Sequence, residues 1–401
     1  MSADTLPTAG QPDDREDQRE LERRARTVLE ASWRPPGFCV PNPTTYPWQW
    51  LWDSCFHAVV WAHLGEAERA VTELKNALRH QAADGFVPHM TYWSGERAED
   101  VTHAAFWGRT ATSAITQPPM YGHALAQLHR AGVTPPAELV ERARLGLSFL
   151  LDRRAEAGGT PVIVHPWESG CDDSPRWDAW CAPDDHWSPA RWHAVKGELV
   201  EALVFAPTGS AVASRSFVVE APGFAALVAF NARELADVTG DGALRARAEE
   251  VAAVLDGRWR AEVAIWSDVV HAGPPGAAAA VRTLDGLLPV LVSGDDRAVG
   301  TALDRALDAK AYGGRYGPAG VHRDEPAFDA ETYWRGPAWP QLTYLLWWAA
   351  RRRGHPAAAA LRDRLRAGAV RSGFAEYWDP DTGAALGASP QSWTALAAVV
   401  D

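Results

Sequence analysis

The sequence predicts an all-α protein built as a ring of helical hairpins, and two observations lead to this prediction. The first is a series of twelve helix-like stretches that alternate in character along the chain. Amphipathic, charged stretches alternate with stretches that are apolar on nearly all sides, which are typical of outer and inner helices respectively. The second is that turns from charged to apolar stretches are long and rich in Trp, Tyr, Pro and acidic residues, whereas the opposite turns are short.

The alternation gives each element a place in the ring. The stretches expected on the outside, typified by EAERAVTELKNALRHQ, are 14–31, 66–83, 137–153, 243–259, 296–309 and 357–370. Those expected on the inside, typified by PQLTYLLWWAA, are 48–64, 117–131, 224–239, 280–291, 337–353 and 390–400. Six outer–inner pairs predict an (α/α)6 barrel, or toroid. An open helical array alternates in the same way, but such arrays usually carry a sequence repeat, and we find no convincing one.

The expected domain organisation is simple. Residues 1–20 are polar and form a predicted flexible lead-in, and residues 21–401 form a single (α/α)6 catalytic domain. The stretch 154–223 is too long for a turn, so we expect an inserted lid or subdomain there. Within it, PVIVH and SFVVE are candidate short strands.

The long turns should meet at one place. In alternating hairpins, all outer-to-inner turns lie at the same end of the ring, so segments between residues 44 and 393 should form one mouth. Many of the 20 tryptophans fall in these segments. The flat indole face suits the C–H face of a sugar ring, although a single buried Trp is often only a large core residue.

Composition excludes several partners. The formal net charge of −12 and the pI near 5.6 argue against nucleic acid or an anionic membrane surface as a partner. No uncharged apolar run is long enough to span a membrane. The first residues lack an apolar signal segment, so we expect a cytoplasmic protein with reduced thiols, a Cys171–Cys181 disulfide being the alternative. The sequence carries no signal of an oligomeric state.

The predicted mouth is rich in carboxylates. Inverting hydrolysis of a glycosidic bond needs two of them, one to protonate the leaving oxygen and one to activate water. Desolvation among tryptophans should raise the pKa of Asp172 and keep it protonated, and Glu376 comes from the opposite side of the ring. From the residues alone this pair is one choice among several. The acids expected at the mouth are Asp53, Glu168, Asp172, Asp173, Asp178, Glu331, Glu376 and Asp379.

Each polar residue has a structural alternative. Asp53 could stabilise a helix dipole, and Glu376 could be a solvated turn residue. His89 could be a satisfied structural histidine, and Arg335 could pair with Glu331. The motifs of serine hydrolases, NTPases, zincins and dinucleotide-binding proteins are absent, and no metal is expected. The aspartates of one segment could form a calcium loop, although they lack the EF-hand spacing: Asp172, Asp173, Asp178, Asp184 and Asp185.

Five segments together resemble glycoside hydrolase family 63, especially its short bacterial mannosylglycerate and glucosylglycerate hydrolases. They occur in the family's order across residues 44–400, and trehalases share the ESGxD-type segment. The resemblance implies an (α/α)6 catalytic barrel that inverts configuration without a cofactor. The segments are YPWQWLWDSCFHA, GFVPHM, HPWESGCDDSPRWD, YWRGPAWP and EYWDPDTG.

The resemblance also implies roles for particular residues. It places the general acid at Asp172 and the general base at Glu376. It implies that Tyr333 and Gln391 contact glycerate, and it leads us to expect a glycerate-binding Arg between 190 and 222, where the match is weak and Arg215 is the candidate. The other predicted substrate-binding residues are Tyr46, Trp50, Trp52, Asp53, His89, Trp177, Trp334 and Arg335.

The expected activity is therefore hydrolysis of a small α-glucoside or α-mannoside. The best candidate is glucosylglycerate or mannosylglycerate, which would release a hexose and D-glycerate. The catalytic carboxyl groups should lie about 6.5–9.5 Å apart, which leaves room for water. One alternative is another α-glucosidase or a trehalase-like enzyme. A second is a sugar epimerase, which needs paired histidines and has only His89 and His165 near the mouth. A third is a non-catalytic sugar-binding protein, which has no need of two acids.

Overall fold

The computed structural model describes residues 14–93, 105–154, 159–181, 187–277 and 280–401. The chain is mostly helical, as predicted. Helix α1 begins at Asp14, so residues 14–20 belong to a helix and not to the expected lead-in, while residues 1–13 lie outside the described residues. Among the described helices, none combines the length and the hydropathy that crossing a membrane requires.

The predicted outer elements are amphipathic helices. Each buries one face and exposes the other, which is the pattern that their charged sequences indicate. Helix α10 illustrates how these helices begin, because the Asp241 side chain accepts hydrogen bonds from the backbone N–H groups of Ala243 and Leu244. The outer helices are α1 (Asp14–Ser32), α3 (Ala67–Ala77), α6 (Ala137–Arg153), α10 (Gly242–Asp256), α11 (Asp296–Leu307) and α13 (Ala357–Ser372).

The predicted inner elements are buried over almost their whole length. Helix α9 begins with proline at a position whose N–H a helix leaves unused, and it ends at Gly240 in the left-handed conformation. The inner elements are α2 (Leu51–His63), α5 (Tyr121–Arg130), α9 (Pro222–Thr239), η3 (Leu284–Leu291), α12 (Pro340–Arg352) and η4 (Ser392–Ala398).

Two inner elements differ from the prediction, because η3 and η4 are 3-10 helices. In η3, Pro289 has no N–H to donate, so a regular α-helical ladder cannot pass through it. At the start of η4, the N–H of Ser392, which has no acceptor within its own helix, donates to the carbonyl of Pro41.

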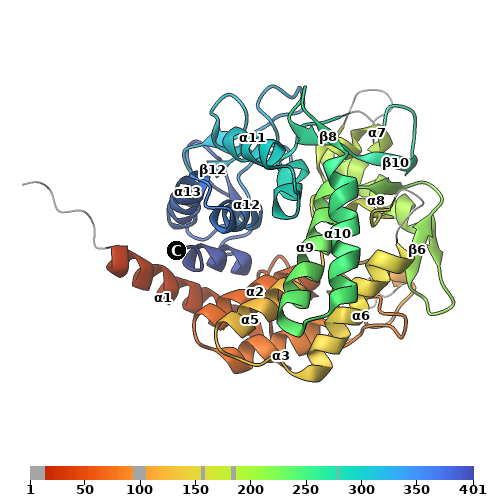
Figure 1. Ribbon diagram of the computed structural model, residues 1–401, viewed down its shortest axis with the longest axis horizontal. Helices are drawn as coiled ribbons and strands as arrows, with labels where there is room; N and C mark the ends of the chain where they lie inside the picture. The colour runs from red at the N-terminus through yellow and green to blue at the C-terminus, as the bar shows by residue number, and fades with distance from the viewer. Residues whose placement is uncertain (1–13, 94–104, 155–158, 182–186, 278–279) are drawn as a thin grey trace, which may run out of the picture.

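The inner elements contact one another in chain order. Helix α2 packs on α5, α5 on α9, α9 on η3, η3 on α12, and α12 on η4, while η4 in turn contacts α2. Each outer helix packs on an inner element: α1 on η4, α3 on α2, α10 on α9, α11 on η3, and α13 on α12. Helix α6 packs on both α5 and α9. Figure 1 views this arrangement, with α1 beside the C-terminus.

The insertion predicted at 154–223 contains its own small elements. Strand β7 (Val218–Glu220) lies in the predicted SFVVE segment and pairs antiparallel with β10 (Val269–Ala272). Ile163, in the predicted PVIVH segment, forms an isolated bridge with Val219. The remaining elements are η1 (Pro166–Ser169), η2 (Pro175–Trp177), α7 (Asp178–Cys181), α8 (Pro189–Glu201), β5 (Leu203–Phe205) and β6 (Ala211–Ser214).

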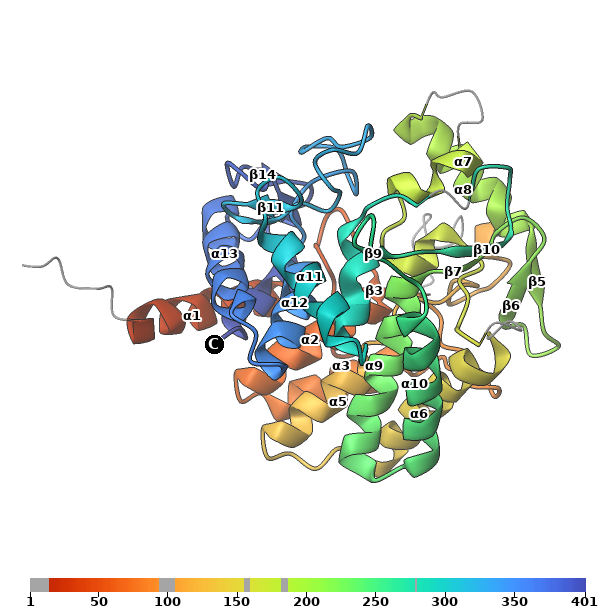
Figure 2. The same ribbon diagram turned by 45° about the horizontal axis from the view of Figure 1, so that its top comes forward.

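The other strands are pairs of two-residue segments within the long turns. In Figure 2 the inserted elements lie at the upper right, and β11 and β14 lie at the upper left, above most of the helices. The pairs are β1 (Trp33–Arg34) with β2 (Phe38–Cys39), β3 (Gln49–Trp50) with β4 (Met90–Thr91), β8 (Trp259–Arg260) with β9 (Ile265–Trp266), β11 (Gly313–Gly314) with β12 (Gly317–Pro318), and β13 (Tyr377–Trp378) with β14 (Ala385–Leu386).

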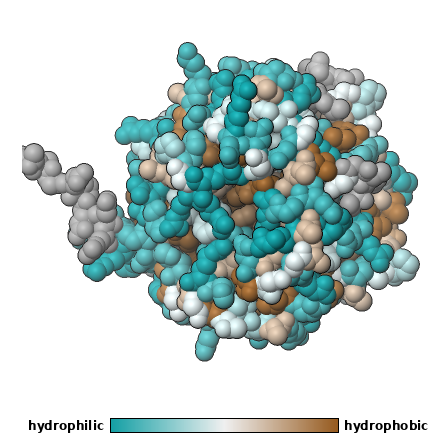
Figure 3. Space-filling model, viewed as in Figure 1, coloured by the Kyte–Doolittle hydropathy of each residue, from teal (hydrophilic) through white to brown (hydrophobic). Residues whose placement is uncertain are grey.

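Two hydrophobic clusters fill the described part of the chain. The larger one joins the inner elements to the buried faces of the outer helices. The smaller one includes Met90, Tyr92 and Trp107, and Trp50 and Trp167 pack against it. Near the centre of the face seen in Figure 3 there is a hollow in which hydrophobic residues are visible. The four cysteines are buried free thiols, so the alternative of a Cys171–Cys181 disulfide is wrong.

Candidate active site

A cavity of about 500 Å³ is lined by residues from the long turns and from the insertion. Its size suits a small ligand. The lining residues extend from Pro41 to Trp393 in sequence, which agrees with the expectation that the long turns meet at one mouth. The predicted site residues in the lining are Tyr46, Trp50, Trp52, Asp53, His89, Asp172, Tyr333, Trp334, Glu376 and Gln391.

Two predicted substrate-binding residues, Trp177 and Arg335, lie outside this lining. The Trp177 indole donates to the carbonyl of Cys171 at 2.9 Å and is buried. Arg335 forms two hydrogen bonds with the Asp178 carboxylate, at 2.8 and 2.6 Å, and also donates to the backbone carbonyl of Asp173. Both side chains therefore support the Asp172 loop and do not face the cavity.

The loop that carries Asp172 requires a glycine. Gly170 has a φ of 73°, and a Cβ there would come within 2.7 Å of the Trp52 ring. The backbone N–H of Cys171 donates to the Ser169 hydroxyl, and the Trp192 indole donates to the Asp172 carbonyl at 2.8 Å. These contacts hold the Asp172 loop so that the Asp172 side chain lines the cavity.

Lys196 on α8 determines the charge of this acid. Its ammonium nitrogen lies 2.8 Å from Asp172 Oδ2 and also donates to Asp173. Burial alone would raise the pKa of Asp172, but Lys196 and a hydrogen bond from Asp173 lower it below its ordinary value. The expectation that desolvation keeps Asp172 protonated is therefore wrong for this structure. Burial and the negative charge of Asp172 raise the pKa of Asp173 to about 7 instead.

Glu376 lies just before β13, and its side chain and carbonyl accept three hydrogen bonds. Its Oε1 accepts a hydrogen bond from the Tyr46 hydroxyl at 3.1 Å, and its Oε2 accepts one from the Ala388 N–H at 2.9 Å. The Trp393 indole donates to its backbone carbonyl. Burial raises the pKa of Glu376 to about 7, and the charges of Asp53 and Asp172 add to this increase. Glu376 is 2% exposed, so it is not a solvated turn residue.

The other expected acids are separated from the cavity. The buried Glu168 pairs with Arg154. Asp379 caps a turn, because its Oδ1 accepts hydrogen bonds from two backbone N–H groups. Glu331 is exposed and also lies outside the lining. Of the eight acids expected at the mouth, the described lining contains Asp53, Asp172 and Glu376.

A calcium loop at the aspartates of this segment is also disfavoured, because three of them already form ion pairs. Asp172 and Asp173 pair with Lys196, and Asp178 pairs with Arg335, so these carboxylates already have cationic partners. The remaining two members of that set, Asp184 and Asp185, lie outside the described residues.

Several polar atoms in the cavity wall have no partner among the described residues. They are Asp53 Oδ1, Gln391 Oε1 and the indole nitrogens of Trp50 and Trp334. Asp53 is buried, and this burial raises its pKa to about 7. A buried polar atom without a partner is costly unless a ligand or water satisfies it. Such a group of donors and acceptors beside indole faces suits a polyhydroxylated ligand.

Trp334 has an unusual conformation that supports a role in binding. Its φ is 57°, in the left-handed region that residues with large side chains rarely occupy. Its ring stacks on Trp339 with 3.6 Å between the ring centres and 7° between the planes. Backbone strain of this kind persists where the surrounding packing fixes it, often at ligand sites.

Sequence reasoning missed four polar residues of the wall: Thr45, Gln117, and two residues of α8, His193 and Lys196. The sequence signal for this helix was present. Ser188 accepts a hydrogen bond from the backbone at the helix start, where Pro189 follows it, and this Ser-Pro pair is a typical helix start. The missed wall residues that are not polar are Pro41, Met90, Gly170 and the aromatic residues Trp48, Tyr92, Phe106, Trp107, Trp167 and Trp393.

His89 and His165, the two histidines expected near the mouth, do not face the cavity as the pair that an epimerase needs. His89 lies against Trp50, and its Nδ1 is 2.5 Å from the Ser113 hydroxyl. Burial lowers the pKa of His89 to about 3, so it is neutral. His165 lies outside the lining and contacts the carbonyl of Lys196 through Nε2. Arg215, the candidate glycerate ligand, also lies outside the lining and donates to the carbonyl of Glu201.

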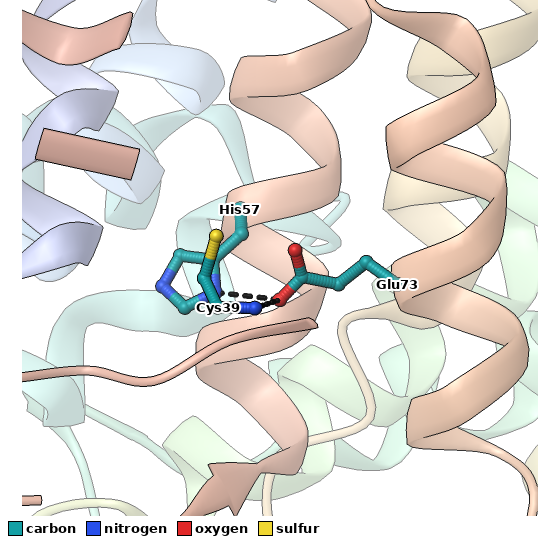
Figure 4. Close-up of side chains that lie close together, drawn as sticks. All are labelled: Cys39, His57 and Glu73. Carbon is teal, nitrogen blue, oxygen red and sulfur yellow. Dashed lines mark hydrogen bonds and ion pairs between the residues drawn. The ribbon is translucent and has the colours of Figure 1, made fainter. Parts of the chain in front are cut away.

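Three buried side chains elsewhere come close enough to share a metal ion. Cys39, His57 and Glu73 each offer a ligand atom within 4.8 Å of the others (Figure 4). Glu73 Oε1 already lies 2.8 Å from His57 Nδ1 and accepts the Cys39 N–H, and His57 Nε2 contacts the Ser392 hydroxyl. We therefore interpret this cluster as a hydrogen-bonded connection between β2, α2, α3 and η4.

Comparison with known proteins decides the family. The model of the family described as the mannosylglycerate hydrolase MGH1-like glycoside hydrolase domain matches residues 46–394. The chain belongs to this family. A mannosylglycerate hydrolase of Thermus thermophilus is 32% identical, with 94% of this chain and 99% of that protein aligned. A glucosylglycerate hydrolase of Mycolicibacterium hassiacum is 31% identical, with 90% of this chain and 92% of that protein aligned.

Solved structures agree with this assignment. A family 63 mannosylglycerate hydrolase from Thermus thermophilus, in complex with Tris and D-glycerate, matches this MGH1-like domain with a TM-score of 0.79 and 26% identity. The match covers 95% of this chain and 99% of the other. The predicted resemblance to family 63 is confirmed, and the MGH1-like domain is a glycoside hydrolase.

Proposed function

We propose that this hydrolase cleaves 2-O-α-D-glucosyl- or 2-O-α-D-mannosyl-D-glycerate with inversion, releasing a β-hexose and D-glycerate. The observation that carries this proposal is that Asp172 and Glu376 line one cavity. Among the other acids expected at the mouth, only Asp53 is in the described lining. The relatives named as mannosylglycerate and glucosylglycerate hydrolases support the substrate. The ring of contacts among the inner elements supports the finer fold assignment, an (α/α)6 toroid.

The proposed chemistry follows from the two carboxyl groups. Asp172 donates its proton to the glycosidic oxygen while the bond from that oxygen to C1 breaks. Glu376 accepts a proton from a water molecule whose oxygen bonds to C1 on the opposite face. In a complex, the two carboxyl groups should lie about 6.5–9.5 Å apart. Asp53 and the Trp50 indole bind sugar hydroxyls, and Tyr333 and Gln391 face the glycerate.

A substrate panel tests the proposal. Purified protein is given 2-O-α-D-glucosyl-D-glycerate, 2-O-α-D-mannosyl-D-glycerate, trehalose, kojibiose and maltose, and the released hexose is followed by NMR. We expect one of the two glycerate glycosides to have the highest kcat/KM and the β-anomer to appear first. The Glu376→Gln variant serves as the control for contaminating enzymes. A higher kcat/KM for trehalose or maltose, or initial release of the α-anomer, would contradict the proposal.

The raised pKa values of Glu376 and Asp173 predict a narrow pH optimum near neutrality. Glu376 must be ionised to act as a base, and since its pKa is raised to about 7, the active fraction increases as the pH rises through this value. The Asp172–Asp173 pair must keep one proton, and the pKa of about 7 at Asp173 means that this proton is lost at higher pH. We expect kcat/KM to fall on both sides of neutrality.

The measurement is kcat/KM against pH. Tyr46→Phe provides a matched variant, because the Tyr46 hydrogen bond lowers the pKa of Glu376. Its loss should move the acidic limb to higher pH. An acidic limb near the ordinary glutamate value of about 4.3 would show that the cavity does not perturb Glu376.

A further inference from the structure

Lys196 is the one Lys or Arg side chain in the described lining of the cavity. An ammonium group has three N–H donors, and among the described residues the structure uses two of them, on Asp172 and Asp173. The Lys196 side chain is only 6% exposed, and it lies 5.5 Å from the Trp167 ring and 5.7 Å from the Trp192 ring. A third donor therefore remains for a ligand, on a cation whose position is fixed.

The position of the two aspartates makes this cation more than a binding group. Asp172 lines the cavity, whereas Asp173 lies behind it and outside the lining. The two carboxyl groups are hydrogen-bonded to each other and share one ammonium partner. In the structure, Lys196 favours an ionised Asp172 and leaves the proton of the pair on Asp173. That state cannot protonate a leaving group.

We propose that Lys196 binds the carboxylate of an anionic leaving group and thereby moves the proton shared by Asp172 and Asp173 onto Asp172. This inference rests on the proposed function, which supplies a leaving group with a carboxylate. A ligand carboxylate on Lys196 lies inside the cavity, nearer to Asp172 than to Asp173. Its negative charge offsets the ammonium and favours the protonated form of the nearer aspartate.

The other groups around Asp172 do not provide this charge change. Tyr46 and Tyr333 have pKa values raised above their ordinary range by burial, so both remain neutral. His89 and His165 have pKa values lowered to about 3 by burial and are also neutral. Glu376 stays in place as the base. Among the described residues, His193 also lines the cavity, and the ionisable groups with an electrostatic interaction with Asp172 include Tyr46, His89, His165, Cys171, Asp173, Lys196, Tyr333 and Glu376.

The test compares two substrates that differ in one charge. In 2-O-α-D-glucosyl-D-glycerate the leaving group carries a carboxylate, and in 2-O-α-D-glucosylglycerol a hydroxymethyl group replaces it; the mannosyl pair is used if mannose is preferred. Lys196→Met should lower kcat/KM for the charged substrate about 100-fold, because the loss of a buried charge contact has this magnitude. The neutral substrate should change less than about tenfold, which corresponds to less than 1.4 kcal/mol.

Two controls separate this effect from damage to the fold. Arg191→Met removes an exposed positive charge from the same helix and should leave both values unchanged. α-Glucosyl fluoride has a leaving group that needs no proton, so Lys196→Met should lose far less activity on it than on the charged glycoside. A Lys196→Met protein that keeps the wild-type preference for the charged substrate overturns the proposal, and so does one that loses activity equally on both substrates.

A second measurement needs no variant. With the charged substrate, the basic limb of kcat in the wild-type enzyme should lie at higher pH than the basic limb of kcat/KM, because the bound carboxylate stabilises the proton on Asp172. With the neutral substrate the two limbs should coincide. Coincident limbs with the charged substrate overturn the role of Lys196. Wild-type enzyme that cleaves α-glucosyl fluoride but neither glycoside of the pair would instead overturn the proposed substrate, and with it this role.

Discussion

Replacing Glu376 by Gln is expected to lower kcat by about three orders of magnitude, because an amide cannot accept the proton of the attacking water. The replacement preserves the shape of the side chain. The Gln carbonyl can still accept a hydrogen bond from Tyr46 or from the Ala388 N–H, the two groups that position the carboxylate. The effect should therefore fall on kcat, and the substrate KM and the thermal midpoint should change little.

Asp172→Asn should cause a similar loss with a glycerate glycoside, but for a different reason. An amide cannot donate a proton to the leaving oxygen, whereas its carbonyl can still accept a hydrogen bond from Lys196. With α-glucosyl fluoride, which needs no general acid, Asp172→Asn should keep substantial activity and Glu376→Gln should not. Comparing kcat for the two variants on the two substrates distinguishes acid from base.

Glu331→Gln is a suitable control, because Glu331 is an exposed acid outside the cavity. It should retain wild-type kcat on both substrates. If Glu376→Gln keeps activity on the fluoride while Asp172→Asn loses it, the two roles are reversed. The comparison is informative because the electrostatics of the structure favour an ionised Asp172 and raise the pKa of Glu376.

The alternation of charged and apolar helices was sufficient to predict which elements lie inside. Burial depends on which sides of a helix are apolar, and this property is visible in the sequence of α12 or α3 without knowledge of their neighbours. The 3-10 form of η3 was less visible, because it depends on how Pro289 interrupts pairing in a short buried segment. Residues 14–20 were assigned both to the predicted lead-in and to the predicted outer stretch 14–31, and the structure places them in α1.

The site was predicted less evenly than the fold. Asp172, Glu376 and three of the seven tryptophans in the described lining, Trp50, Trp52 and Trp334, were placed in one cavity, mainly through the family motifs. Arg335 was expected to face the sugar, but it pairs with Asp178 outside the lining. The charge state of Asp172 could not be predicted, because it depends on Lys196, which lies 24 residues away in the weakly matched insertion. Burial alone predicts a protonated acid, and one buried cation reverses this.

Replacing Glu168 by Gln, in the motif that precedes Asp172, is expected to cause the second large effect, a loss of folding stability. Its carboxylate pairs with the guanidinium of Arg154, and both side chains have no exposed surface. It also accepts hydrogen bonds from the backbone N–H groups of Thr116 and Val164, at 3.1 and 2.8 Å. Glu168→Gln leaves a buried arginine without its counter-charge, which typically destabilises a protein by about 3–5 kcal/mol.

The measurement is the free energy of unfolding in urea, together with kcat/KM, since Glu168 lies two residues before the glycine that directs Asp172 into the cavity. Glu141→Gln is the matched control: Glu141 also pairs with an arginine, Arg144, but both side chains are largely exposed. An exposed pair of this kind contributes about 0–1 kcal/mol, so the control should remain near wild type. Equal stability of the two variants would mean that water or a protonation change compensates Arg154. The loop before Asp172 would then depend on Trp177 and Ser169 and not on the buried ion pair.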